Sequence, residues 1–355
     1  MNFLRTLSAP ITFLYWLVIV FRNKMYDLQL FHSRSFNIPI ISVGNINVGG
    51  TGKSPTVEYL IKLLQDEKRV ATLSRGYGRK TTGYLEASAL SSPDEIGDEP
   101  TQFKQKFNNI KVVVDENRVR ALEKLEHEVD VVIMDDAYQH RKVKAGLNIL
   151  LFDYNKVFIN DWMLPMGNRR EPIAGLDRAD IIMITKTPKI FSPMERRRVE
   201  AHLPNHSNIP IIYSYLKYAE LKPLHSTYEE KKFTTLDKKT SVILLTGIAD
   251  AKLLINHLEF HKLKIVKHFN YPDHHSFQQK DIDKLKIEYD NLDTTNKIII
   301  TTEKDAMRLL HPKFENKLDA LPMYYLPIEA DVHEKDKEWF DTRILNYVRS
   351  NKEYH

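Results

Sequence analysis

A glycine-rich segment near the amino terminus, VGNINVGGTGKS at residues 43–54, contains the residue types that hold nucleotide phosphates. Its glycines leave room for backbone N–H groups to close around a β-phosphate. Lys53 can neutralise the β and γ oxygens, and the Ser54 hydroxyl can bind magnesium. We therefore predict a phosphate-binding loop, or P-loop, whose nucleotide contacts come from Asn47, Val48, Gly49, Gly50, Thr51, Gly52, Lys53 and Ser54.

One residue departs from the strict form of this loop, because Asn47 stands where the pattern has its first glycine. The context still fits, since an apolar run precedes the loop and a segment with helical spacing follows it. Pro55 is compatible with the first turn of that helix, where a backbone N–H has no helical partner. The alternative is a glycine turn without a ligand.

A second candidate is the pair Asp135 and Asp136, which follows an apolar run of four residues. A P-loop enzyme needs an acidic residue at the end of a neighbouring strand to hold the magnesium shell. An aspartate in this position can instead cap a helix or form a turn. Together with the P-loop, the pair predicts a metal-linked role.

The elements that must position these residues alternate between short β-branched runs and amphipathic stretches. Continuous apolar runs of this kind are typical of a parallel sheet that is covered on both faces. The pattern predicts an α/β protein with a mostly parallel, P-loop NTPase-like sheet and flanking helices, plus a smaller C-terminal α/β domain and an N-terminal apolar helix. We place the boundaries at 1–24 for the helix, 25–205 for the P-loop core, 206–240 for a linker, and 241–355 for the C-terminal domain.

The N-terminal helix is predicted from an uncharged stretch at residues 6–21 that is flanked by Arg5, Arg22 and Lys24. It is short for a full membrane span, which needs about 20 apolar residues. Its aromatic residues favour the membrane interface. We predict a membrane-associated helix, and the alternative is a helix docked on the protein's own core.

The composition of the 355-residue chain sets wider limits. The absence of cysteine excludes disulfides and thiolate metal sites. The net charge of +5 suits an anionic membrane surface, an acidic substrate or nucleic acid, so charge alone does not choose among these partners.

Seven motifs in order identify a family resemblance: GNINVGGTGKSP, LSRGYGR, GDEP, DDAYQHRKV, LPMGNRREP, YPDHHSF and TTEKDAMRL. They resemble the bacterial tetraacyldisaccharide 4'-kinases, the lipid A 4'-kinases, from the N-terminal segment to about residue 310. The resemblance implies ATP- and Mg2+-dependent phosphorylation of the 4'-hydroxyl of an acylated glucosamine disaccharide 1-phosphate. It also implies a monomer at the cytoplasmic face of the inner membrane, with an anionic membrane surface and no nucleic acid as partner. Ala137 and Tyr138 depart from the glycine and phenylalanine usual in the family.

Two further roles come from the resemblance. Asp98 in GDEP matches the family's catalytic base, and His274 in PDHH matches its histidine partner. From the residues alone, Asp98 is more simply explained as a helix N-cap. His274 with His275 is more simply a solvated pair, and a metal site there lacks a third ligand at a recognisable spacing.

Charged residues in the other motifs also match family positions. Arg75, Arg118 and Arg170 are implied to stabilise the transferring phosphoryl group and to bind the substrate phosphate, and Glu171 to support the magnesium site. Each could instead be a solvated side chain. Gln139 and His140 follow the two aspartates closely enough to line the same cleft.

Two other functional classes remain to be compared. A partition-type membrane ATPase has a similar loop but requires a lysine where this chain has Val48. A GTP-binding module needs a spacer between a lysine and an aspartate, whereas Lys304 and Asp305 are adjacent. Both comparisons favour the kinase.

Overall fold

A large sheet of nine strands forms the centre of the computed structural model, which describes residues 7–157, 161–203, 208–273, 275–310, 312–314 and 317–350. Its strand order is β14-β8-β7-β6-β1-β5-β2-β4-β3. The strands are β1 (Ile40–Asn45), β2 (Val70–Ser74), β3 (Leu85–Glu86), β4 (Lys111–Val114), β5 (Val131–Asp135), β6 (Leu147–Asp153), β7 (Ile181–Thr185), β8 (Ile211–Tyr218) and β14 (Ile328–Val332).

The seven inner strands of this order, β8-β7-β6-β1-β5-β2-β4, run parallel. Only the edge strands β3 and β14 are antiparallel to their neighbours. The carboxyl ends of the parallel strands therefore meet at one edge of the sheet. β1 lies between β5 and β6, so the connections on its two sides diverge at this point. Open α/β sheets bind ligands outside the carboxyl ends of their strands at such a switch point.

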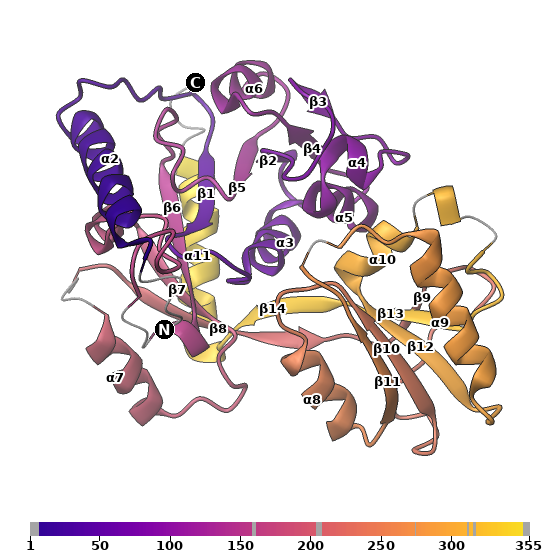
Figure 1. Ribbon diagram of the computed structural model, residues 1–355. Helices are drawn as coiled ribbons and strands as arrows, with labels where there is room; N and C mark the ends of the chain where they lie inside the picture. The colour runs from indigo at the N-terminus through magenta and orange to yellow at the C-terminus, as the bar shows by residue number, and fades with distance from the viewer. Residues whose placement is uncertain are drawn as a thin grey trace.

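Helices cover both faces of this sheet, because the strands are apolar on both sides (Figure 1). One face packs against α3 (Lys53–Leu64), α5 (Asp98–Lys106) and α11 (Glu334–Ser350). The other packs against α6 (Arg118–Leu125) and α7 (Pro193–His202). α4 (Pro93–Ile96) and the short 3-10 turns η1 (Tyr154–Lys156) and η2 (Ile173–Arg178) lie in the connections. The predicted α/β class and mostly parallel sheet are confirmed.

A second, smaller unit contains a five-stranded sheet in the order β11-β10-β12-β13-β9. Its strands are β10 (Ser241–Thr246), β11 (Lys264–Asn270), β12 (Lys297–Thr302), β13 (Met323–Leu326) and β9 (Lys222–Pro223). Its helical elements are α8 (Lys252–Phe260), α9 (Gln279–Asn291), α10 (Glu303–Leu309) and η3 (Pro312–Phe314). Separate buried clusters form its core on the two faces of this sheet.

The chain divides between the two units differently from the predicted boundaries. Residues 211–218, predicted to lie in a linker, form β8 and pair with β7 in the large sheet. The chain also returns to the large sheet after β13, because β14 pairs with β8. Phe340, Ile344 and Val348 then pack α11 into the large core at helical spacing. The smaller unit is thus an insertion between two strands of the large sheet.

Ion pairs connect the two units beside α3 and α5. Lys106 Nζ lies 2.7 Å from Glu58 Oε2 and 3.1 Å from Glu303 Oε1, and Glu303 belongs to α10 of the smaller unit. Gln102 donates to the Glu58 carboxylate at 2.6 Å. Glu58 is 2% exposed. A buried carboxylate with these partners gives the contact between units a pH dependence.

We expect the free energy of unfolding to fall as the pH rises, because of the titration of Glu58. Burial, reinforced by the charge of Glu303 and opposed by Lys106, raises the pKa of Glu58 from 4.5 to about 7. Between these values the folded protein keeps a proton that the unfolded chain has released, so the free energy of unfolding falls with increasing pH. Glu58→Gln removes this titration, and its stability relative to wild type should rise by at most about 3 kcal/mol across the window. Urea denaturation at pH 5 and pH 7.5 measures the difference, and a constant difference would contradict the expectation.

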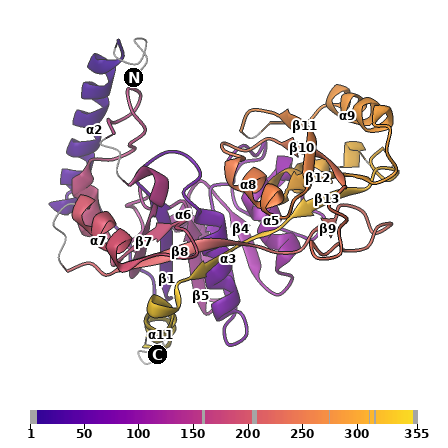
Figure 2. The same ribbon diagram turned by 90° about the horizontal axis from the view of Figure 1, so that it is seen from below.

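The N-terminal helix α2 (Ala9–Asp27) lies at the end of the molecule opposite the smaller unit (Figures 1 and 2). One side, with Thr12 and Ile19 buried, packs against the loops at the carboxyl edge of the large sheet. The opposite side exposes large apolar residues: Ile11, Phe13, Leu14, Leu17, Val18 and Phe21. Within the described residues, no helix has both the length and the hydropathy needed to cross a membrane.

Candidate active site

The predicted phosphate loop leads from the end of β1 into the start of α3. Gly49 and Gly52 have φ angles of 106° and 83°, which L-residues rarely adopt, so glycine is required at both positions. Gly52 also lies so close to Thr185 that an added Cβ would be 3.3 Å from that side chain. Asn45 Nδ2 donates to Thr51 Oγ1 at 2.7 Å across the loop. The backbone is thus shaped before a nucleotide is present.

Asn47, the residue that departs from the strict motif, forms a β-bridge with Arg169. The next residue, Val48, donates its N–H to the carbonyl of Asn168 at 2.7 Å. This start of the loop is therefore paired like a strand and does not need the conformational freedom of glycine. The departure is explained by the support that the segment 168–170 gives to the loop.

Lys53, Asp136 and Arg170 come together at the mouth of this loop. Lys53 Nζ lies 3.6 Å from Asp136 Oδ1, and Arg170 Nη1 donates to the two Asp136 oxygens at 2.9 and 3.0 Å. Burial alone would raise the pKa of Asp136, but the charges of Lys53 and Arg170 outweigh it and lower the pKa. Asp136 is thus an anion that fixes two cations where nucleotide phosphates would lie.

Asp135 is buried directly behind this group. Burial, with the charges of Asp136 and Glu99, raises its pKa to about 7. Its Oδ1 atom is buried without a hydrogen-bond partner within the described part of the chain. Ser54, at the first turn of α3, is also buried. A buried carboxylate oxygen without a donor is the kind of group that a cation would satisfy.

No cluster of three or more His, Cys, Asp or Glu residues suited to a metal was found in the residues that the structure describes. A magnesium ion at a P-loop takes much of its coordination from phosphates and water, so two protein ligands are compatible with it. Asp135 and Ser54 fit that requirement.

Glu171 occupies a different environment from the two aspartates. It is 0% exposed, and its Oε2 accepts from Arg178 at 2.7 Å and from Asn23 at 3.3 Å. The structure therefore places the predicted metal-supporting residue in an ion pair with η2 and in contact with α2. Its other oxygen, Oε1, is buried without a partner in the described structure.

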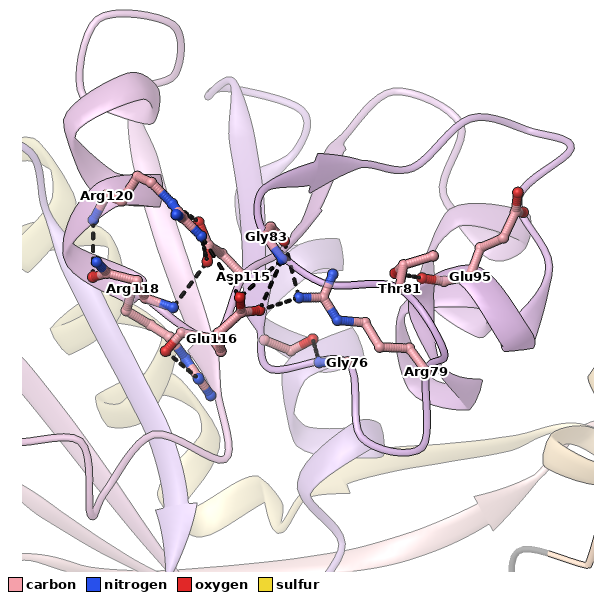
Figure 3. A network of polar contacts seen from close by, with 11 residues as sticks. Gly76, Arg79, Thr81, Gly83, Glu95, Asp115, Glu116, Arg118 and Arg120 are labelled. Carbon is pink, nitrogen blue, oxygen red and sulfur yellow. Dashed lines mark hydrogen bonds and ion pairs between the residues drawn. The ribbon is translucent and has the colours of Figure 1, made fainter.

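Arg118 and Arg75 extend the site along the same edge of the sheet. Arg118 begins α6 and is 5% exposed, whereas Arg75 follows β2 and is exposed. Burial and the positive charge of Arg75 lower the pKa of Arg118, so the two side chains lie near each other. Two neighbouring arginines each have a carboxylate partner: Arg120 forms an ion pair with Asp115, and Arg79 forms one with Glu116 (Figure 3).

Arg118 has a weaker set of partners. Its Nη1 donates only to the Glu116 carbonyl, at 3.5 Å, and its Nε is buried without a partner. No carboxylate within the described residues lies at ion-pair distance from it. A buried guanidinium without a carboxylate is suited to an anionic ligand.

Gln139 and His140 follow the two aspartates in the loop after β5. Gln139 donates to the Asn45 carbonyl at 2.7 Å, which supports the end of β1. Burial and the charges of Arg118, Lys142, Arg22 and Arg75 lower the pKa of His140 to about 4, so its imidazole is neutral at pH 7. The position of Gln139 and His140 in the nucleotide cleft stays a prediction, and the observed contacts show Gln139 bonded to the end of β1 and His140 near the charges of Arg118 and Arg75.

Asp98 lies at the start of α5, across from the smaller unit. Gly97 is the N-cap of this helix and Asp98 its first residue, so the N-cap interpretation of Asp98 does not apply. The Asp98 carboxylate accepts from Arg308 Nη2 at 2.6 Å and Nε at 3.1 Å. The adjacent Glu99 pairs with Lys304 at 2.5 Å. Both basic partners belong to α10 in the motif TTEKDAMRL.

His274 lies outside the described residues. Its neighbour His275 contacts Asp281 at 3.0 Å through Nε2 and stacks on Tyr271, with ring centroids 4.3 Å apart. His275 is therefore engaged within the smaller unit.

Sequence reasoning missed several residues at this edge. Arg308 and Lys304 belong to the motif TTEKDAMRL, and the family resemblance implied no role for either of them. Lys186, directly after β7, contacts the Gly50 carbonyl of the phosphate loop and lies 2.9 Å from Asp153. Lys186, like Asp135, is a polar residue at the end of an apolar strand, so the same sequence pattern predicts that it lies at this edge.

Comparison with known proteins identifies relatives over nearly the whole chain. A family model described as tetraacyldisaccharide-1-P 4'-kinase (LpxK) matches residues 4–348. The tetraacyldisaccharide 4'-kinase of Bacteroides fragilis is 41% identical over 96% of this chain and 93% of that protein. The protein of the same name from Flavobacterium psychrophilum is 41% identical over 99% of both chains.

A solved structure agrees with these relatives. The crystal structure of LpxK from Aquifex aeolicus in complex with ATP has a TM-score of 0.74 and 30% sequence identity, and the match covers 97% of this chain and 99% of that one.

Proposed function

The chain belongs to the tetraacyldisaccharide-1-phosphate 4'-kinase family, and we propose how its residues transfer the γ-phosphate of ATP to the 4'-hydroxyl of an acylated glucosamine disaccharide 1-phosphate in lipid A biosynthesis. The observation that carries the proposal is the meeting of Lys53, Asp135 and Asp136 where β1 and β5 end at one sheet edge. Phosphoryl transfer requires mainly positioning and fixed positive charge, and this arrangement supplies both.

The phosphate loop binds the nucleotide. Backbone N–H groups of residues 49–54 would surround the β-phosphate, because the Val48 N–H is already donated to the Asn168 carbonyl, and the start of α3 adds the positive end of its dipole. Lys53, held by Asp136, neutralises the γ-phosphate oxygens, and Arg170 reinforces the same charge. Ser54 and Asp135 would hold Mg2+, with Asp136 beside them. When bound, the ion would offset the charge that develops on the phosphates.

Asp98 is the proton acceptor on the other side of the transferring group. It takes the proton of the 4'-hydroxyl as that oxygen bonds to the γ-phosphorus and the bond from phosphorus to the ADP oxygen breaks. Arg308 holds the Asp98 carboxylate from the smaller unit, and His274 acts with Asp98. The charge of Glu99, next in the chain, reaches Asp135, which supports a position of Asp98 near the phosphate loop.

Arg118 and Arg75 bind the anionic end of the acceptor. Arg118 is buried without a carboxylate partner among the described residues, and Arg75 lies near enough to lower its pKa. A phosphate monoester would satisfy both guanidinium groups with charge-assisted hydrogen bonds. We assign the 1-phosphate of the disaccharide to this position.

The exposed side of α2 rests on the membrane that contains the acceptor. Apolar residues cover this side over the length of the helix, and Lys24 follows them at its end. Apolar burial and attraction between basic residues and anionic lipid together support binding at an interface. A monomer at the cytoplasmic face of the inner membrane is sufficient, because one chain supplies every group named above.

Incubation of the purified protein with labelled ATP and a lipid disaccharide 1-phosphate in detergent tests the function. We expect a new 4'-phosphate on the lipid and little ATP turnover when the acceptor is omitted. Turnover of ATP or GTP that ignores the acceptor would overturn the proposal.

The apolar side of α2 gives a second expected result. Replacement of Phe13, Leu14 and Phe21 by serine should reduce sedimentation with anionic vesicles at least about fivefold, because each exposed side chain loses apolar area that the membrane would bury. Phe260→Ser serves as the control, since Phe260 is even more exposed but lies on α8 of the smaller unit. Unchanged sedimentation of the triple variant would contradict the membrane assignment.

A further inference from the structure

We propose that α2 is also a positioning element of the active site, whose polar side holds Arg170 and Glu171 and thereby sets the position of Asp136 and Lys53. The proposal rests on the kinase function proposed above. It assigns a role in turnover to Tyr15 and Asn23, which lie on α2 and are not part of the phosphate loop.

The contacts follow one side of the helix. Thr12 Oγ1 accepts from the Met166 N–H at 3.1 Å, and the Tyr15 hydroxyl donates to the Arg170 carbonyl at 3.0 Å. Asn23 Nδ2 donates to Glu171 Oε2 at 3.3 Å. Positions 12, 15 and 23 share one face at helical spacing. All three contacts lead to the segment 166–171.

A second loop is held from the same side of α2. Arg22 Nη2 donates to the Gln139 carbonyl at 2.6 Å, and Gln139 in turn supports Asn45 at the end of β1. Arg141 Nη1 donates to the Asn23 carbonyl at 3.0 Å. The loop that follows Asp135 and Asp136 is therefore also fixed against α2.

Arg170 transmits the position of α2 to the site. Its carbonyl accepts from Tyr15, and its N–H donates to the Ile46 carbonyl at 2.7 Å, just before the phosphate loop. Its guanidinium holds Asp136, which holds Lys53. One hydrogen bond and two ion pairs thus separate α2 from the amine that meets the γ-phosphate. A displacement of the helix would move this chain of contacts.

The polarity of the contact argues against a purely anchoring role. Within the described residues, Ile19 is the one buried apolar residue of α2, and Thr12, Tyr15, Arg22 and Asn23 all make hydrogen bonds to the loops beneath the helix. Arg22 Nε, Asn23 Oδ1 and Glu171 Oε1 are buried without a partner in the described structure. Buried polar groups of this kind cost free energy that apolar docking would avoid. Directional hydrogen bonds do fix the position of the segment that they contact.

The proposal predicts that Tyr15→Phe combined with Asn23→Ala lowers kcat in detergent about tenfold, with little change in the KM for ATP. The magnitude follows from the sensitivity of transfer reactions to small displacements of positioned groups and of the residues that support them. Vesicle sedimentation of the variant should match wild type, because the apolar side of α2 is intact. Turnover is measured with labelled ATP and the lipid disaccharide 1-phosphate, at a temperature where the unfolding curve shows every variant folded.

Tyr347→Phe is the matched control. Its hydroxyl also bonds to the backbone, at Ile40 N and O with 3.0 Å each, but at the amino end of β1, away from the phosphate loop. We expect this variant to lose stability and keep its kcat. Wild-type kcat in the Tyr15 and Asn23 variant would overturn the positioning role, as would an equal loss in Tyr347→Phe. Failure of wild type to phosphorylate the lipid would instead overturn the proposed function.

Discussion

Lys53→Ala lowers the rate of phosphate transfer to the lipid at least about a hundredfold, as expected when a preorganised charge is removed from a phosphoryl-transfer site. The Lys53 side chain is 17% exposed and its amine lies 3.6 Å from Asp136, so its position is set before the nucleotide arrives. Water entering in its place would have to reorganise during the reaction. The measurement is kcat with saturating labelled ATP and lipid acceptor.

Lys62→Ala is the control for this result. Lys62 lies on the same helix and pairs with Glu329 at the surface, away from the phosphate loop. Surface ion pairs contribute little, so turnover should stay within about twofold of wild type. If Lys53→Ala also remains within a few-fold, the phosphate loop does not have the role proposed for it.

Asp98→Ala should lower kcat about a hundredfold to ten-thousandfold, the range for loss of a general base. ATP affinity should change little, because Asp98 is assigned to the acceptor. Glu99→Gln tests the main alternative, since it breaks the adjacent ion pair between the units, with Lys304, and leaves Asp98 in place. A loss in Glu99→Gln as large as that in Asp98→Ala would mean that contact between the units, rather than proton transfer, limits the rate.

The partnership of Asp98 with His274 is tested by the double variant Asp98→Ala/His274→Ala. Residues that act as one unit lose their effects non-additively, so the double variant should be scarcely slower than the worse single variant. Fully multiplicative losses would show two independent roles. A large loss of ATP binding in Asp98→Ala would move that residue to the nucleotide side.

Local patterns were sufficient for the phosphate loop and the strands around it. The glycines, Lys53 and Ser54 are neighbours in the chain, and a positive φ at Gly49 and Gly52 is a local property. Asp135 was found because it ends an apolar run, and in a parallel sheet all such ends meet at one edge. The sequence by itself therefore determined the α/β class and the nucleotide end of the site.

Only the tertiary structure decided which distant charges meet. Arg308 binds Asp98 across 210 positions, and Glu171 faces Arg178 and Asn23 instead of the phosphate loop. The tertiary structure also decided the contacts of the polar side of α2, because the hydropathy of this segment predicted only an apolar helix. Hydropathy and spacing report how one element is buried, whereas the partner of a buried charge depends on how elements from different parts of the chain pack together.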